Sequence, residues 1–454
     1  MAENIIRGEF EYNGKAYPFV IQTKILTVVQ SAFHYLDDFN GKEELGILVG
    51  VTDTNQYILL LDCRVWNPQF ITLSGKLQIV LHGYVLQDIK DDGYDRIKFC
   101  SPALNVFYSP RKAWTPQMGI EEELPGLTMN PYSDSTQQTT INILEEDIQC
   151  TLGFEWSFNL RFEDCHAFSV KTSFSMAFQE RKTSADIGKY YLYLRDFLVF
   201  ANFRSDIPFD EITLSRRGKD GKFRKSGKVV IFQADGITYD LKVQNTITYD
   251  DLSADSFTAL FKEIAEQRAL DQYNPYFIPS NRAESNVVDR AKWLVTASSF
   301  EGEFDKKYKD IKAEQSAEFQ RAKSLLLSAI DRAVDDSGVS LNNTQNKYLK
   351  SFRHLIDRFD TTIKEKYKFC ERHFATEVED VQKKHCRLTG VPLDTDFSEK
   401  YAEARNRSAH GVIEPIRNTD VVTFVILRCF IYLLIMERAA VPSAKMKEII
   451  AKLF

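Results

Sequence analysis

Three polar residues near the end of the 454-residue chain carry side chains suited to chemistry on a phosphate group: Arg405, Asn406 and His410. Histidine exchanges protons near neutral pH, and the planar guanidinium of arginine binds phosphate oxygens through paired hydrogen bonds. On a helix that turns about 100° per residue, Arg405 and His410 lie roughly 140° apart, whereas Asn406 and His410 share a face. One helix therefore does not bring the arginine and the histidine together.

The stretch that holds these residues is predicted to be a helix. Phe397, Tyr401 and Ala404 recur at spacings of three and four residues, which is the pattern of a helix with one buried face. Polar residues over 394–398 offer a cap at its start, and Gly411 is suited to end it. The polar cluster therefore lies at the C-terminal end of this helix.

The cluster resembles the R-x4-H motif of HEPN ribonucleases in its Arg-Asn-x-x-x-His form. Long predicted helices precede it, an apolar helix follows at 421–436, and a β-rich half fills the N-terminal side. The whole layout is similar to that of ApeA-type phage-defence proteins, with the HEPN part over 285–454. The resemblance implies a metal-independent endoribonuclease that acts in anti-phage defence by abortive infection. It also implies a homodimer formed through the HEPN domain and a β-rich part that senses a phage-derived trigger.

The resemblance further implies how RNA, with tRNA as one candidate, would be cut. The 2′-hydroxyl of RNA attacks the adjacent phosphate, which requires proton transfer near neutral pH and a cation beside the phosphate. His410 would transfer the proton, Arg405 would bind the phosphate, and Asn406 would orient His410 or bind a phosphate oxygen. Arg407 is a weaker RNA-binding candidate at the cleft rim. Two motifs facing one cleft of a dimer would supply both groups, without a metal or other cofactor.

Two other classes of function stay open from the residues alone. If Arg405 only pairs with a carboxylate and His410 only ends a helix, the chain is a non-catalytic dimerisation or nucleic-acid-binding module whose β part binds a partner. A metal-dependent nuclease lacks a clear set of Asp, Glu and His ligands. Cys370 and His373 could share a metal, but the next pair lies about 15 residues further on one predicted helix, at His385 and Cys386. We interpret these cysteines as core residues.

Composition limits the alternatives further. A net charge of −6 argues against a chain that coats nucleic acid along its length. Seven scattered cysteines and a start without a signal-peptide pattern predict a reducing cytoplasm. The longest apolar run, 421–436, contains Arg428 and is shorter than the roughly 20 residues of a membrane span. It is predicted to be a helix buried in the fold or between subunits, with no role in a membrane.

The expected fold class is α+β, with a β-rich sandwich- or barrel-like domain over 1–250, a helix and linker over 251–284, and an all-α HEPN bundle of about five helices over 285–454. An Asn-Gly pair predicts a hairpin over 10–17. Further strands are predicted at 45–51, 57–65, 77–86, 96–100, 105–108, 140–144, 148–158, 166–178, 211–214, 229–233 and 238–243, with a long loop at 109–138. Helices are predicted at 184–202, 253–269, 284–308, 313–334, 344–385, 421–436 and 444–454, with a linker at 271–280.

A second candidate site is the basic segment 215–228, predicted to connect two strands. Its RNA-binding candidates are Arg216, Arg217, Lys222, Arg224 and Lys225. Three glycines in the same segment are equally typical of a solvated, flexible turn. Cys165 and His166 are adjacent on a predicted strand, so their side chains would face opposite sides and would not form a nucleophile and base pair.

Overall fold

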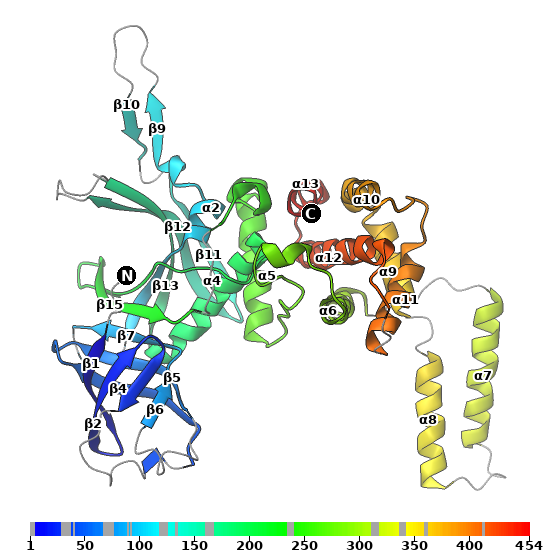
Figure 1. Cartoon of the computed structure of the whole chain (residues 1–454), viewed down its shortest axis with the longest axis horizontal. Helices are drawn as coiled ribbons and strands as arrows, with labels where there is room; N and C mark the ends of the chain where they lie inside the picture. The colour runs from blue at the N-terminus through cyan, green and yellow to red at the C-terminus, as the bar shows by residue number, and fades with distance from the viewer. Residues whose placement is uncertain are drawn as a thin grey trace. The chain divides into compact units, whose positions relative to one another are not determined.

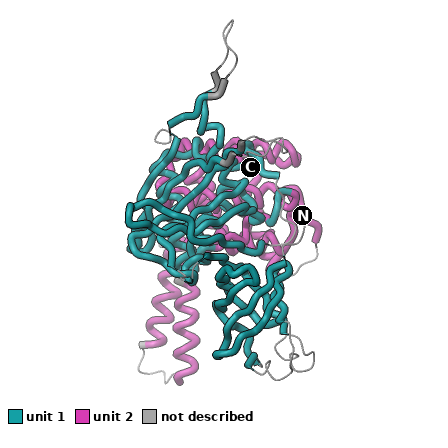
Figure 2. Tube along the Cα trace, turned by 90° about the vertical axis from the view of Figure 1, so that its left-hand side faces the viewer, with its two compact units in different colours: residues 1–273, 280–282 teal, residues 274–279, 283–454 magenta. Residues whose placement is uncertain are grey.

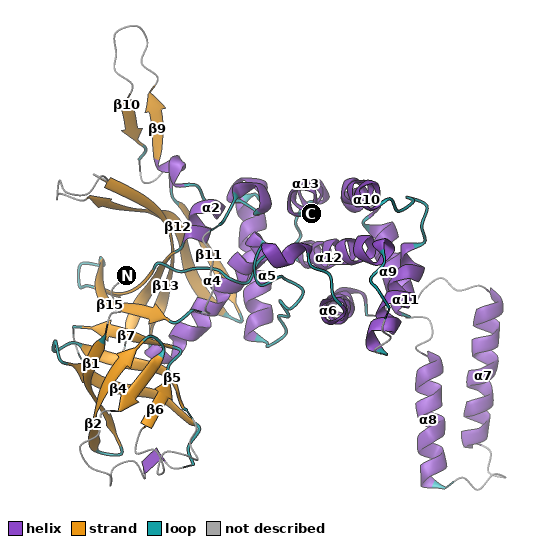
Figure 3. Ribbon diagram, in the orientation of Figure 1, coloured by secondary structure: helices purple, strands orange, loops and turns teal. Residues whose placement is uncertain are grey.

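The computed structural model describes residues 5–28, 38–39, 41–66, 77–88, 90, 93–117, 126–131, 135–158, 168–233, 240–309, 317–335, 342–357, 362–410 and 414–454. The chain folds into two compact units (Figure 2), one formed by 1–273 and 280–282 and the other by 274–279 and 283–454. The first unit contains the strands, whereas the described elements of the second are all helical (Figure 3). The fold class is therefore α+β. Cys165 and His166 lie outside the described residues.

The first unit is built on one antiparallel sheet with thirteen described strands (Figure 1). These strands are β1 Ile6–Tyr12, β2 Lys15–Gln22, β3 Ile25–Val28, β4 Glu44–Thr52, β5 Tyr57–Val65, β6 Leu77–Val80, β7 Gly83–Gln87, β8 Tyr94–Cys100, β11 Gln137–Ile143, β12 Glu146–Phe158, β13 Phe168–Lys182, β14 Glu211–Arg217 and β15 Phe223–Ile231. Their order is β11-β12-β13-β8-β14-β15-β7-β5-β4-β1-β2-β3-β6, and β5 also pairs with β6. Strands β1 to β6 therefore close into a barrel-like ring, and the other seven extend the sheet.

The first hairpin shows why the chain begins with β structure. Tyr12 of β1 pairs with Lys15 of β2, so only Asn13 and Gly14 form the turn. Both turn residues have positive φ, 51° and 72°, which Asn and Gly adopt at low cost and which suits a two-residue hairpin. The predicted hairpin is confirmed.

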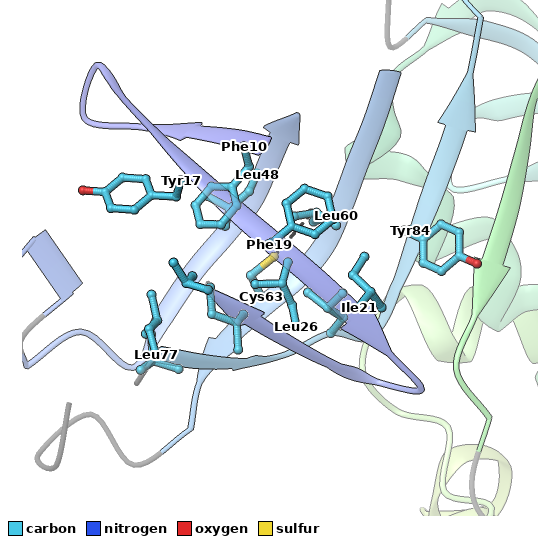
Figure 4. Packing of buried hydrophobic residues seen from close by; sticks show 14 of the residues in the cluster. Phe10, Tyr17, Phe19, Ile21, Leu26, Leu48, Leu60, Cys63, Leu77 and Tyr84 are labelled. Atoms are coloured by element: carbon cyan, nitrogen blue, oxygen red, sulfur yellow. Dashed lines mark hydrogen bonds between the residues drawn. The ribbon is translucent and has the colours of Figure 1, made fainter. Parts of the chain in front are cut away.

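The ring encloses an apolar core (Figure 4). Every second residue of β2 points inward, including Tyr17, Phe19 and Ile21. Phe10 of β1 stacks on Tyr17 with ring centroids 5.5 Å apart, and Leu60 of β5 lies in the same core. Closing the sheet pairs strands that would otherwise expose their backbone groups at an edge.

Two helices cover the extended part of the sheet. They are α4 (Ile187–Asn202), close to the predicted 184–202, and α5 (Ala254–Ala269). Phe174 of β13 contacts Phe261 of α5, with centroids 5.4 Å apart, and Phe178 contacts Tyr190 of α4 at 4.4 Å. Because α5 packs on α4 and β11, the first unit continues past residue 250.

Three strand predictions in this unit are wrong. The predicted strand 105–108 is a short helix, α2 (Pro102–Phe107), because the Ser101 side chain accepts a hydrogen bond from the Ala103 N–H and Pro102 occupies the first turn. The predicted strand 77–86 is two strands, since at Leu81 and His82 the chain leaves the ring and joins the extension. Of the predicted strand 238–243, residues 240–243 are loop and the start of a 3-10 helix, and the first two lie outside the described residues.

The described part of the predicted loop 109–138 includes a small hairpin. It contains β9 (Trp114–Gln117) and β10 (Gly126–Met129), which pair with each other, and β11 begins at Gln137. Pro116 of β9 is compatible with this two-stranded ribbon, because both strands of a ribbon are edge strands.

The second unit contains eight described helices. They are α6 Arg290–Tyr308, α7 Ala317–Asp335, α8 Asn343–Asp357, α9 Ile363–His373, α10 Ala375–Thr389, α11 Phe397–Ala409, α12 Asn418–Arg438 and α13 Ser443–Leu453. The single helix predicted over 344–385 is wrong, because the chain forms α8, α9 and α10 there. Helix α9 starts where the Thr362 side chain accepts a hydrogen bond from the Glu365 N–H. Phe374, with φ −108° and ψ 25°, then separates α9 from α10.

Helix α12 forms the centre of this unit. It is long and apolar enough to cross a membrane, yet most of its residues are buried within the unit. It packs against α6, α10, α11 and α13. This burial makes α12 the core helix of the unit, and it leaves α12 little apolar surface for a second copy of the chain.

A polar cluster around the carboxylate of Glu146 joins β12, β13 and α4 in the first unit. Glu146 accepts hydrogen bonds from Lys189 Nζ at 2.8 Å and from Tyr190 Oη at 2.6 Å, and Lys182 Nζ lies 2.7 Å away. Burial opposes ionisation of Glu146, but the hydrogen bonds from Lys182, Lys189 and Tyr190 outweigh it and lower its pKa from 4.5 to about 2. The ionised form is therefore the stabilising one.

This cluster predicts a specific acid sensitivity. Because the folded-state pKa of Glu146 lies below its unfolded-state value, its stabilisation is present above pH 4.5 and is lost as the pH falls towards 2. The Glu146→Gln variant is expected to lose stability less steeply over this interval than the wild type, as measured by urea unfolding of the full chain. The exposed neighbour provides the control, since Glu145→Gln should keep the wild-type slope. Equal slopes for wild type and Glu146→Gln would contradict the prediction.

Candidate active site at the end of helix α11

Helix α11 carries the polar cluster, and its start is capped as expected from the sequence. The Asp396 side chain accepts hydrogen bonds from the Glu399 N–H at 3.0 Å and from the Ser398 hydroxyl at 2.6 Å. The bond from Ser398, followed by that from the Glu399 N–H, lowers the pKa of Asp396. The helix ends at Ala409, and the His410 N–H donates to the Asn406 carbonyl at 3.0 Å. The predicted helix is confirmed.

Aromatic packing fixes the buried face of α11. Tyr401 stacks on Tyr367 of α9, with ring centroids 5.2 Å apart, and on Trp293 of α6 at 6.2 Å. Phe300 of α6 meets the same ring edge-on at 5.7 Å. Burial, together with the negative charge of Glu301, raises the pKa of Tyr401 far above its usual range. Tyr401 is therefore a neutral packing residue that sets the rotation of α11, and hence where its polar residues point.

Arg405 lies beside a carboxylate of a neighbouring helix. Its Nε is 3.5 Å from Glu301 Oε1 of α6, and its side chain keeps 34% of its surface exposed. The contact is an ion pair without a hydrogen bond between the two atoms, and it leaves part of the Arg405 side chain exposed. Glu301 was not among the residues predicted for the site, because no local sequence pattern links positions more than 100 residues apart.

Asn406 and His410 are exposed at the end of α11. Among the residues described, no hydrogen bond or ion pair joins Arg405 to His410, in agreement with their angular separation on one helix. The structure thus brings Asn406 and His410 to one exposed helix end, with Arg405 to the side. Two exposed polar groups and a partly exposed cation are accessible to a ligand from solvent.

Arg407 has a different environment from the other three residues. Its Nη2 lies 2.7 Å from Asp420 Oδ1, and Glu403 and Glu414 carboxylates lie 3.7 and 3.9 Å from its guanidinium. Asp420 is buried and also accepts the Arg417 N–H at 3.0 Å, which caps the start of α12. Arg407 therefore connects α11 to α12, and these carboxylates compete with any phosphate for it.

A small cavity adjoins Arg407. Its lining includes Arg290, Trp293, Ser408 and Glu414, and its volume is about 20 Å³. A space of this size holds about one water molecule and excludes a nucleotide. Any RNA contact at α11 would therefore use the exposed helix end.

The basic segment forms a tight hairpin between longer strands than predicted. β14 extends to Arg217 and β15 begins at Phe223, and the Gly218 N–H donates to the Lys222 carbonyl at 2.8 Å. Gly221 has φ +75°, a conformation that favours glycine. The segment is therefore a structured strand pair with a short turn, in place of the expected long connection.

Several cations of this hairpin have partners within the unit. Arg216 Nε donates to the Gly93 carbonyl at 2.8 Å. Arg224 pairs with Asp220 at 3.1 Å, Lys225 pairs with Glu211 at 3.3 Å, and the Arg217 guanidinium lies 5.3 Å from the Phe223 ring. Lys222 is exposed in the turn. The pairs of Arg224 and Lys225 are exposed to solvent, so these two groups and the exposed Lys222 remain available to a phosphate backbone.

This hairpin predicts a salt-dependent effect on RNA binding. If Lys222 and Lys225 contact phosphates, the variant Lys222→Gln/Lys225→Gln should bind RNA more weakly, and the slope of log K against log salt should shrink by about 0.7 per lost contact. Binding titrations at several salt concentrations measure this slope. Lys90→Gln, another exposed lysine of the first unit, should leave it unchanged. An unchanged slope in the double variant would support the other interpretation, in which the hairpin is a solvated turn without phosphate contacts.

A second polar cluster connects α6, α9 and α12. Glu437 accepts a hydrogen bond from Tyr308 Oη at 2.7 Å, and His373 Nε2 lies 2.7 Å from its other oxygen. Burial raises the pKa of the nearby Cys370 thiol, which is a poor metal ligand in that form. Over the described ranges no group of three or more His, Cys, Asp and Glu side chains is arranged to hold a metal. His373 thus has a carboxylate partner in the fold.

Comparisons of the chain with protein-family models, with curated proteins and with solved structures returned no match.

Proposed function

We propose that the chain is a cytoplasmic, metal-independent endoribonuclease of the HEPN type that acts in anti-phage defence by abortive infection. The observation that supports it is the accessibility of Asn406 and His410 at the exposed end of α11, with the partly exposed Arg405 to the side. The helix belongs to an all-helical unit in which α6, α9 and α12 pack around it. The β-rich unit would act as the regulator that senses a phage-derived trigger.

The proposed reaction uses the RNA's own nucleophile. The 2′-hydroxyl loses its proton and attacks the adjacent phosphorus, and the bond to the 5′-oxygen of the next nucleotide breaks as that oxygen gains a proton. The products are a 2′,3′-cyclic phosphate and a 5′-hydroxyl. His410 transfers a proton in this reaction, Arg405 offsets the charge on the phosphoryl oxygens, and Asn406 orients His410 or the phosphate. A homodimer would bring a second copy of the motif to the same RNA.

The test is the chemistry of the cut. Purified full-length chain is expected to cleave RNA in the presence of EDTA and to leave a 2′,3′-cyclic phosphate on the upstream product. An RNA with a single 2′-deoxy nucleotide at the cut position should resist, because it lacks the nucleophile. Loss of cleavage in EDTA, or cleavage at the deoxy position, would refute this mechanism.

One observation favours the alternative of a non-catalytic module. The ion pair between Arg405 and Glu301 gives the arginine a structural partner within its own chain. In that case the helical unit would serve dimerisation or nucleic-acid binding, and the β-rich unit would bind a partner. RNA bound without cleavage under all activating conditions would support this alternative.

A further inference from the structure

A cavity of about 160 Å³ lies in the first unit, between the edge of the sheet and the first turn of α5. Helix α5 packs on β11, which is the outermost described strand of the sheet (Figure 1). On the floor of the cavity, Gln137 of β11 is level with Leu152 of β12, and Leu152 is level with Phe174 of β13. Residues directly opposite each other in a sheet point to the same side, which here is the side that α5 covers.

The side chains that could fill this space are short. Thr139 of β11 and Cys150 of β12 form the next level of the floor, and Ala254 and Thr258 of α5 line the cavity on the helix side. The Thr139 and Thr258 hydroxyl oxygens lie 3.3 Å apart and close one side. An engineered cavity of about 150 Å³ in another protein binds benzene. The cavity beside α5 therefore has room for one six-membered ring.

Aromatic side chains form a wall of the cavity. The ring centroids of Tyr249 and Phe257 are 5.6 Å apart, and those of Phe257 and Phe174 are 6.4 Å apart. Aromatic side chains pack best on other planar rings, in offset-stacked or edge-to-face arrangements. The wall therefore favours a planar ligand.

The polar groups of the lining are mostly neutral and can both donate and accept hydrogen bonds. The Tyr249 hydroxyl donates to Gln137 Oε1 at 3.2 Å, which holds the carboxamide beside the aromatic wall. Burial raises the pKa of the Cys150 thiol and that of the Tyr249 hydroxyl, so both groups are protonated at neutral pH. A carboxamide and hydroxyl groups complement a ring whose edge carries amide-like donors and acceptors.

The charge of the lining excludes anions. Among the described residues that line the cavity, Asp255 carries the single charged side chain, and it is exposed. A phosphate or carboxylate ligand would lie near this carboxylate without a cation to pair with. The ligand that fits this lining therefore has no negative charge.

We propose that this cavity binds an uncharged, single-ring heterocycle with amide groups, of the chemical class of a free pyrimidine base or its nucleoside. The ring would lie against Phe257, with its edge hydrogen-bonded to Gln137 and the threonine hydroxyls. The sugar of a nucleoside would extend past Ala254 and Asp255, which are exposed, into solvent. Binding at this site does not depend on RNA cleavage, so its test measures binding alone.

Calorimetric titration of the full-length chain with cytosine and with cytidine is expected to give a Kd below about 1 mM for each. Ala254 is exposed at the start of α5, so Ala254→Trp can fill the opening without displacing core residues, and it should weaken binding at least about tenfold. Ala269→Trp, at the exposed last residue of the same helix, is the matched control and should bind like the wild type. Gln137→Leu should weaken binding about tenfold, because it removes hydrogen bonds to the ring. Circular dichroism checks that each variant is folded.

A second comparison tests the exclusion of anions. Cytidine 5′-monophosphate should bind the wild type about tenfold more weakly than cytidine, because its phosphate lies near the Asp255 carboxylate. Asp255→Asn should reduce this difference. Glu145→Gln, which removes an exposed carboxylate from the turn after β11, should keep it.

Four results would overturn the proposal. The first is no binding of cytosine or cytidine by the folded wild type at millimolar concentration, and the second is equal affinity in the wild type and Ala254→Trp. The third is a monophosphate that binds as tightly as cytidine, which would assign the cavity to nucleotides or to a base of a nucleic acid. The fourth is toluene that binds more tightly than cytosine, which would leave the polar edge of the cavity without a role in binding.

Discussion

Replacing His410 with alanine is expected to reduce RNA cleavage by about 10³-fold, and Arg405→Ala by a similar factor, because proton transfer and charge stabilisation each contribute a factor of about 10² to 10⁴. His410 is exposed and Arg405 is partly exposed, so neither contributes much to the core. The measurement is cleavage of labelled RNA by the purified full-length variants. Arg387→Ala and His354→Ala, which alter exposed residues of the same types elsewhere in the helical unit, are matched controls.

Substitution of Glu301, the ion-pair partner of Arg405, distinguishes a catalytic role of Arg405 from a structural one. If Arg405 binds the phosphate, Glu301→Gln should retain cleavage, whereas Arg405→Ala loses it with little change in stability. If Arg405 only supports the fold, both substitutions should lower stability to a similar extent. Alanine variants at 405 and 410 that cut as well as the wild type would reject the proposed site.

The largest stability effect is expected at Glu303, a buried carboxylate of α6. It pairs with Arg438 of α12, and Lys306 Nζ lies 2.5 Å away. Glu303 has 2% of its side-chain surface exposed and Arg438 has 12%. Removing one partner of a buried ion pair typically costs about 3–5 kcal/mol, since the other charge stays buried without it. Glu303→Ala should therefore lower the free energy of unfolding of the helical unit by this amount.

Hydrogen exchange of amides in α6 and α12 measures this effect locally, because a chain of two units need not unfold in one step. Glu379→Ala is the matched control, since Glu379 forms an exposed pair with Lys383 on α10. Solvent and salt screen that pair, so exchange should stay close to wild type. If Glu303→Ala also leaves exchange unchanged, the pair with Arg438 does not hold α6 to α12.

Several features of the fold were readable from local sequence. The Asn13-Gly14 turn, the extent of β5 and the position of α11 follow from side-chain period and turn chemistry, which act over a few residues. Two local signals were present but misread. Ser101 before Pro102 is a helix start, and Thr362 with Glu365 has the spacing of a capping box.

The sequence by itself determined the types of the candidate site residues, their spacing on one helix and the class α+β. The pairing of β5 with β6 that closes the ring, the carboxylates around Arg407 and the partner of Arg405 were decided only by the tertiary structure. The physical reason is distance along the chain. Periodicity and capping depend on neighbours within one or two turns, whereas strand closure and ion pairs between helices depend on how separate elements pack. Glu301 lies beside Arg405 because the packing of Tyr401 on Trp293 and Phe300 sets the rotation of α11 against α6.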